Sequence, residues 1–240
     1  MLNIEHLTKT YPGGKVAVRD LSIHVAPGDI YGFIGHNGAG KTTTLKCVAG
    51  ILKQDAGVIR INGRDLNADP MACKRDMAYI PDNPDLYDHL TGIQYLNFIA
   101  DIYGVTGQQR TQAIGEYADA FEITANLGDL LCSYSHGMKQ KLAIISALIH
   151  SPRLMLLDEP FVGLDPKAAV TLKTIMRRKC AEGCAIFFST HVLDVAQKLC
   201  NKVAIIRDGE LVVSGDTETL TGDKSLEDVF MEVVEGDTGN

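Results

Sequence analysis

The segment from Gly35 to Thr42 has the residue types and the spacing of a phosphate-binding loop. It reads Gly-His-Asn-Gly-Ala-Gly-Lys-Thr, which fits the pattern glycine, four residues, Gly-Lys-Ser/Thr. Glycines let the backbone turn so that several N–H groups point at one anion, and a following helix adds its positive N-terminal end. Lys41 would reach the β- and γ-phosphates, and the Thr42 hydroxyl would bind Mg²⁺. The loop therefore predicts nucleotide binding, but it leaves the reaction open, because kinases, GTPases, helicases and transport ATPases all use it.

A pair of carboxylates follows a second apolar segment. Residues 154–157 are all apolar, as expected for a buried parallel strand, and Asp158 and Glu159 come directly after them. In a phosphate-loop protein such a strand end brings Asp158 to the Mg²⁺ shell, and Glu159 is then placed to polarise an attacking water. A strand capped by solvated acids is the alternative, and the phosphate loop argues against it.

The elements that must position these residues alternate along the chain. Residues 21–25 show the period-two pattern of a half-buried strand, and residues 29–34 form a short strand that leads into the loop. Helical stretches dominate from about residue 85 to 149, for example over 94–103 and 109–121, which indicates a helical insertion into an α/β core. Strand character returns at 185–188, and 203–213 reads as a hairpin. The tail carries an apolar stripe that predicts a helix packed against the body.

Composition excludes several classes of function. The 240 residues are 45% hydrophobic and 22% charged, which is typical of a folded protein, and the net charge of -7 gives no support to a nucleic-acid partner. No stretch approaches the roughly 20 apolar residues of a membrane helix, and the N-terminus lacks the features of a signal peptide, so a cytosolic protein is expected. The six scattered cysteines indicate thiols in a reducing compartment rather than a zinc site.

Four further motifs make nearly the whole chain resemble the ABC ATPase family. Residues 135–141 read Ser-His-Gly-Met-Lys-Gln-Lys, a variant of the family signature Leu-Ser-Gly-Gly-Gln. Residues 163–166, Gly-Leu-Asp-Pro, match the D-loop, and His191 after Ser-Thr matches the switch histidine. Tyr11 matches the aromatic residue that stacks on adenine. The signature, the D-loop and the switch histidine in this order separate the family from other phosphate-loop enzymes.

The resemblance implies the fold. It is an α/β fold, a RecA-like phosphate-loop core with an N-terminal antiparallel β subdomain and an inserted α-helical subdomain. The expected division of a single domain over 1–240 places the nucleotide-binding core at 1–84 and 151–220. The helical subdomain then covers 85–150, and a C-terminal helix and tail cover 221–240.

The resemblance also implies the site residues. Glu159, His191 and Lys41 would be catalytic, with His191 contacting the γ-phosphate and orienting the water together with Glu159. Mg²⁺ would be held by Thr42, Asp82 and Asp158. The nucleotide-binding residues would be Tyr11, Gly35, His36, Asn37, Gly38, Ala39, Gly40, Lys41, Thr42, Thr43, Ser135, Gly137 and Asp165.

Partners follow from the same resemblance. In the family, Ser135 would begin a helix that faces the ATP of an opposite chain, so ATP would join a head-to-tail dimer, either with a second copy or with a paralogous ATPase. The implied function is an ATP-hydrolysing subunit that drives separate membrane permeases from the inner face of the cell membrane. Residues 85–92 follow the loop that would sense the permease, and with the tail they are most similar to exporter-type subunits.

Three residues depart from the family pattern. His136 stands at the first signature glycine, Met138 stands at the signature glutamine, and Asp82 replaces a glutamine that joins the Mg²⁺ shell. These departures leave two alternatives: a nucleotide-gated interaction module without turnover, or a non-transport ABC ATPase. The combination of Lys41, Asp158, Glu159 and His191 argues for an active enzyme.

Overall fold

The chain forms two β-sheets, and the computed structural model describes residues 1–235. The larger sheet has the strand order β10-β9-β3-β8-β7-β6 and is parallel except for β10, which pairs antiparallel with β9. Its strands are β3 (Ile30–Ile34), β6 (Met77–Ile80), β7 (Leu154–Asp158), β8 (Ala185–Thr190), β9 (Lys202–Arg207) and β10 (Glu210–Asp216). The predicted hairpin is therefore confirmed as β9 and β10.

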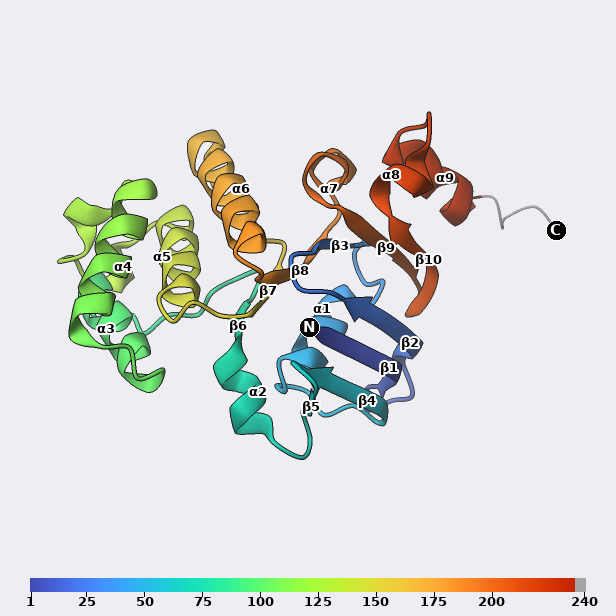
Figure 1. Cartoon of the computed structure of the whole chain (residues 1–240), viewed down its shortest axis with the longest axis horizontal. Helices are drawn as coiled ribbons and strands as arrows, with labels where there is room; N and C mark the ends of the chain where they lie inside the picture. Colours follow the sequence, from blue (N-terminus) through green and yellow to red (C-terminus); the bar gives the residue numbers. More distant parts are fainter. Residues whose placement is uncertain (236–240) are drawn as a thin grey trace.

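The smaller sheet is antiparallel and lies toward the N-terminus. Its order is β2-β1-β4-β5, with β1 (Leu2–Thr10), β2 (Val16–Val25), β4 (Ala56–Ile61) and β5 (Arg64–Asp65). Helix α1 (Lys41–Val48) contacts both β2 and β7, so it packs between the two sheets, and α2 (Pro70–Asp76) contacts β4, β5 and β6. Figure 1 shows this sheet below the larger one.

Two hydrophobic clusters cover opposite faces of the larger sheet. Along β7, Leu154 and Leu156 belong to the cluster shared with α1 and the small sheet, whereas Met155 and Leu157 face the cluster of the other helices. This alternation explains why the strand is apolar at every position, because both faces of a parallel sheet are buried. The carboxyl ends of β3, β7 and β8 meet at one edge, and the phosphate loop, Glu159 and His191 follow them directly.

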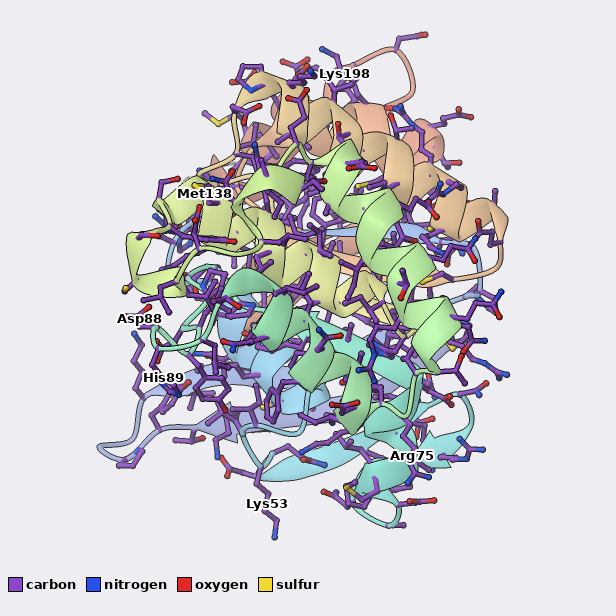
Figure 2. The ribbon with its side chains drawn as sticks, turned by 90° about the vertical axis from the view of Figure 1, so that its left-hand side faces the viewer. Lys53, Arg75, Asp88, His89, Met138 and Lys198 are labelled. Atoms are coloured by element: carbon purple, nitrogen blue, oxygen red, sulfur yellow. The ribbon has the colours of Figure 1, made fainter. Side chains whose placement is uncertain are left out.

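The helices between β6 and β7 form the part at the left of Figure 1. They are α3 (Gly92–Ile102), α4 (Gly107–Ala120), the 3-10 turns Thr124–Asn126 and Leu131–Ser133, and α5 (His136–Leu148). The sequence placed α3 two residues too late, because Thr91 and Gln94 form a capping box that begins the helix at Gly92. In Figure 2, Asp88, His89 and Met138 lie along one edge of this part, where Lys139 binds Asp88 at 2.7 Å.

The remaining helices follow β7, β8 and β10. They are α6 (Pro166–Ala181), α7 (Leu193–Leu199), α8 (Thr217–Thr221) and α9 (Leu226–Glu235). Leu226 and Val229 are buried in the core, which confirms the predicted packing of the tail helix, while residues 236–240 lie outside the described part. Within residues 1–235 no helix is both long and apolar enough to cross a bilayer, and the six cysteines are free thiols.

The fold class is as predicted: an α/β core, an antiparallel N-terminal sheet and an inserted group of helices. The division into subdomains at 84–85 and 150–151 stays a prediction.

Candidate functional site

The loop between β3 and α1 takes its shape from glycines that no other residue could replace without a clash. Gly40 has φ +109°, and a Cβ there would lie 2.4 Å from the carbonyl oxygen of Ala17. A Cβ at Gly35 would lie 2.6 Å from the carbonyl oxygen of Ile206. Gly40 is also the N-cap of α1, and it supplies no side chain to cap the helix. The first N–H groups of α1 have no partner within the helix, so they are available to an anion.

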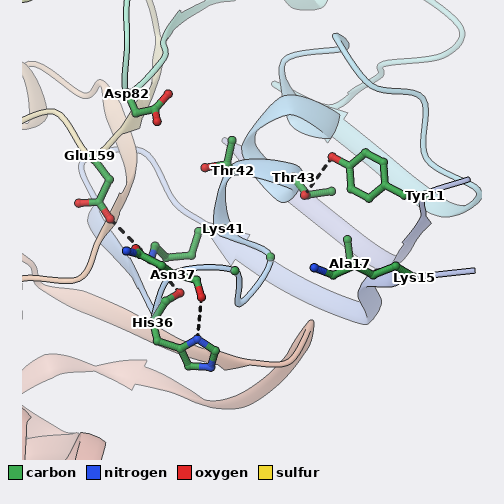
Figure 3. Close-up of a pocket in the computed structure, with 12 residues that line it drawn as sticks. Tyr11, Lys15, Ala17, His36, Asn37, Lys41, Thr42, Thr43, Asp82 and Glu159 are labelled. Carbon is green, nitrogen blue, oxygen red and sulfur yellow. Dashed lines mark hydrogen bonds and ion pairs between the residues drawn. The ribbon is translucent and has the colours of Figure 1, made fainter. Parts of the chain in front are cut away.

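A cavity of about 240 Å³ opens over this loop. Figure 3 shows the side chains of Tyr11, Lys41, Thr42, Asp82 and Glu159 around it. The predicted nucleotide residues His36, Asn37, Gly38, Gly40 and Thr43 also line it, and Gly35 and Ala39 lie in the same loop. Two further lining residues, Lys15 and Ala17, were not predicted.

Tyr11 stands at the outer end of this cavity, at the end of β1. The residue is 37% exposed, and its hydroxyl lies 3.3 Å from the Thr43 hydroxyl. Lys15 reaches the cavity because a turn over residues 12–14 folds β2 back beside β1, and Tyr11 N–H donates to the Lys15 carbonyl at 2.9 Å. The two glycines of that turn were the available signal for Lys15 in the sequence.

Lys41, Glu159 and His191 converge beside the phosphate loop; Lys41 and Glu159 line the cavity, and His191 contacts Glu159 without lining it. Lys41 Nζ donates to the Gly35 carbonyl at 2.5 Å and lies 3.6 Å from Glu159 Oε1. His191 Nδ1 lies 3.0 Å from the same Glu159 oxygen. Burial lowers the pKa of Lys41, while the charge of Glu159 acts in the opposite direction. A cation, a carboxylate and an imidazole therefore lie next to one another beside the phosphate loop.

The backbone of Glu159 is held in an unusual conformation. Its φ is +47°, a left-handed value that a residue with a side chain rarely adopts. The Glu159 N–H donates to the Ser189 hydroxyl at 3.0 Å, and its carbonyl accepts from Val162 N–H at 3.1 Å, so neighbouring segments hold the turn. Strain of this kind costs about 1–3 kcal/mol and is retained mainly at functional sites.

Asp158 is fully buried, and only one of its two carboxylate oxygens has a hydrogen-bond partner. One carboxylate oxygen accepts from the Ser189 hydroxyl at 2.5 Å, and the other, Oδ2, has no protein partner. Burial raises the pKa of this carboxyl, and the nearby hydroxyls of Ser189 and Thr42 only partly oppose that effect. An orphaned carboxylate oxygen beside a threonine hydroxyl is the kind of pair that Mg²⁺ accepts.

Asp82 completes the acidic side of the cavity. One of its oxygens accepts from Asn83 N–H at 2.9 Å, and its charge acts on Asp158. Within residues 1–235 no group of three or more His, Cys, Asp or Glu side chains has the arrangement of a self-contained metal site. Mg²⁺ normally takes one or two carboxylates and completes its shell with water and substrate phosphates, so these residues fit that ion.

Three predicted nucleotide residues lie neither in the lining of the cavity nor in the phosphate loop. The Ser135 hydroxyl accepts from Met138 N–H at 3.3 Å and caps α5, as predicted, and Gly137 lies in the first turn of that helix. Asp165 caps α6 through Ala168 N–H at 2.8 Å and pairs with Lys141. The structure thus groups these residues at a second location in the same chain.

Known proteins are similar to this chain in both sequence and fold. The family model described as "ABC transporter" matches residues 18–162. The "ABC-type transporter ATP-binding protein EcsA" of Bacillus subtilis (strain 168) is 32% identical, over 100% of this chain and 99% of that protein. The "ABC transporter ATP-binding protein NatA" of the same organism is 33% identical, over 89% of this chain and 87% of that protein.

Two solved structures superpose on most of the chain. One, described as "Structure of ATP binding subunit of ABC transporter", has a TM-score of 0.93 at 32% identity and covers 98% of this chain and 99% of that one. The other is a dimeric post-hydrolysis state of the cassette MJ0796 bound to ADP and phosphate, with a TM-score of 0.83. It is 21% identical over 90% of this chain and 99% of that one, so it supports the fold alone.

Proposed function

The chain belongs to the ABC transporter family as an ATP-binding, ATP-hydrolysing subunit, and we propose that it clamps Mg²⁺·ATP between its phosphate loop and the α5 helix of a second chain. Adenine would lie on Tyr11 at the outer end of the cavity. The phosphates would lie on the N–H groups of residues 38–43. Closure of the two chains and their release after hydrolysis would then drive a permease.

Glu159 and His191 carry the chemistry in this proposal. Glu159 takes a proton from the attacking water, whose oxygen bonds to the γ-phosphorus as the bond to the β–γ bridging oxygen breaks, and ADP leaves with inorganic phosphate. The 3.0 Å contact between His191 Nδ1 and Glu159 Oε1 supports a role for the imidazole in orienting that carboxylate and the water. Lys41 offsets charge on the transferred phosphoryl group.

Thr42, Asp158 and Asp82 are the residues that would hold Mg²⁺. The ion would neutralise phosphate charge. The buried Asp158 oxygen without a partner supports this assignment most directly. Asp82, with a shorter stem than the glutamine of the family, would contact the metal through water.

The second chain is proposed because Ser135 and Gly137 lie outside the cavity of their own chain. Their helix begins with N–H groups that one hydroxyl satisfies only in part, so its tip is a second anion site. The cap and first turn of α5 would meet the γ-phosphate held by a facing copy or by a paralogous ATPase. Each nucleotide would then touch two chains.

A permease would dock beside the segment that follows Asp82. Tyr87 and Phe98 are exposed at 52% and 42%, and the Tyr87 ring contacts Tyr95 and Phe98 with centroids 6.4 and 5.8 Å apart. The adjoining Lys139–Asp88 bond, 2.7 Å long, links this segment to the start of α5. An apolar helix of a membrane subunit would place the chain at the inner face of the membrane and sense the state of the site.

The convergence of Lys41, Glu159 and His191 on one point beside the phosphate loop carries the proposal. Steady-state phosphate release tests it. We expect Glu159→Gln to lose about 10²–10⁴-fold in kcat, because the general base is gone, with little change in ATP affinity. The control Glu218→Gln, an exposed residue of α8, should retain wild-type turnover. Equal turnover in the Glu159→Gln protein would overturn the assignment.

A further inference from the structure

His136, at the position where the family signature has glycine, contacts the loop after Glu159 within the same chain. A Cβ at Gly163 would lie 2.4 Å from His136 Cδ2 and 2.8 Å from Nε2, so the imidazole edge rests on the bare backbone of Gly163. Gly163 has φ +79°, which already favours glycine. The histidine and the glycine are therefore complementary in shape.

Gly137 brings the two backbones together at the same place. A Cβ at Gly137 would lie 2.7 Å from the Gly163 carbonyl oxygen. A side chain at Gly137 would push the first turn of α5 away from residue 163. The signature glycine thus has a packing role inside one chain, besides any contact with a nucleotide on another.

The next turn of α5 continues the contact. The buried Gln140 donates through Nε2 to the Pro160 carbonyl at 3.3 Å, and Lys141 Nζ lies 2.8 Å from Asp165 Oδ2. These residues lie four positions after His136 and Gly137, so all four share one side of the helix. That side spans the whole loop from 160 to 165, which begins directly after Glu159.

We propose that His136 is a positioning residue that locks loop 160–165 to the start of α5. The helix tip that serves the nucleotide of the facing chain and the loop that directly follows Glu159 then move as one body. Arrival of the facing nucleotide at Ser135 would be transmitted to Glu159 of the same chain. This inference rests on the proposed function for its consequence, but the lock is a property of the single chain.

Hydrogen exchange of the isolated protein tests the lock without ATP. Val162 and Leu164 N–H donate within the loop, to the Glu159 and Phe161 carbonyls. His136→Gly should speed exchange of these amides by about tenfold, because the loop opens more often when the imidazole is removed. Lys139→Ala, which breaks the Asp88 pair on another side of the same turn, should leave them unchanged. Unchanged exchange in the His136→Gly protein would overturn the proposal.

Turnover tests the consequence. His136→Gly should lower kcat several-fold and leave the KM for ATP within about twofold, because the loop is mispositioned while the nucleotide cavity is intact. Gly163→Ala should be more damaging in the wild type than in the His136→Gly protein, with a coupling of about fivefold or more. Additive effects would refute the lock. Absence of ATPase activity in the wild type would instead refute the proposed function, and the exchange result would stand.

Discussion

Replacing Asp158 by asparagine is expected to stabilise the protein without Mg²⁺ and nucleotide and to abolish its turnover. The carboxylate is fully buried, faces the charges of Glu159 and Asp82, and leaves Oδ2 without a partner. An amide of the same shape keeps the acceptor for Ser189 and removes the buried charge. A buried charge without a full set of partners lowers the free energy of unfolding, and such charges are common at functional sites. Removing this one should raise the free energy of unfolding by about 1–2 kcal/mol.

For a chain of this length, 1 kcal/mol shifts Tm by about 2–4 °C, so Tm of the Asp158→Asn protein should rise by about 2–8 °C in calorimetry with EDTA. Turnover should fall by about 100-fold or more, and Mg²⁺·ATP should add less stability than in the wild type. Asp76→Asn is a matched control: Asp76 accepts from Asn62 and Arg64, so this change should lower Tm. A Tm at or below wild type, with Mg²⁺·ATP stabilisation intact, would refute the reasoning.

Three further predictions concern the cavity and the core. Gly40→Ala should abolish nucleotide binding in calorimetric titration, because the methyl group meets the Ala17 carbonyl at 2.4 Å, whereas Gly13→Ala, at φ +96° with open space around it, should bind normally. Tyr11→Ala should raise the KM for ATP about tenfold because stacking is lost, and Tyr11→Phe should retain the wild-type value. Equal KM values for the two variants would show that the Tyr11 ring does not contact the nucleotide. Burial lowers the pKa of His150 from 6.5 to about 4, so the unfolded chain binds this proton more readily and stability falls as pH drops through that window. Urea unfolding at pH 5 should show a loss of about 2 kcal/mol relative to pH 7.5 that is absent from His150→Phe, and a similar loss in that variant would exclude His150 as its source.

Much of the fold was predictable because its signals are local. The strands at β7 and β8 and the hairpin of β9 and β10 are as expected. Helix ends were less accurate, since the sequence pattern of α3 starts after its capping box. The apolar stripe of the tail indicated a helix packed on the body, which the buried Leu226 confirms.

The site was predictable where chemistry depends on neighbours in sequence. The loop residues and the Asp158-Glu159 pair needed only their order along the chain. Lys15 was missed because it enters the cavity through the pairing of β1 and β2, which the turn glycines indicate but no nucleotide-binding motif marks. The contact of His136 with Gly163 was also missed, because 26 residues lie between them in the sequence and only tertiary packing brings them together.

Light scattering of the Glu159→Gln protein with ATP tests the clamp between two chains most directly. The variant should bind ATP, fail to hydrolyse it and accumulate at twice the monomer mass. Adding Ser135→Arg should keep it monomeric while ATP still binds, because the bulky side chain blocks the tip of α5 without touching the cavity. A nucleotide shared by two chains would be contradicted if dimers formed equally well with Ser135→Arg. It would also be contradicted if the Glu159→Gln protein stayed monomeric in saturating ATP, both alone and with any paralogous ATPase.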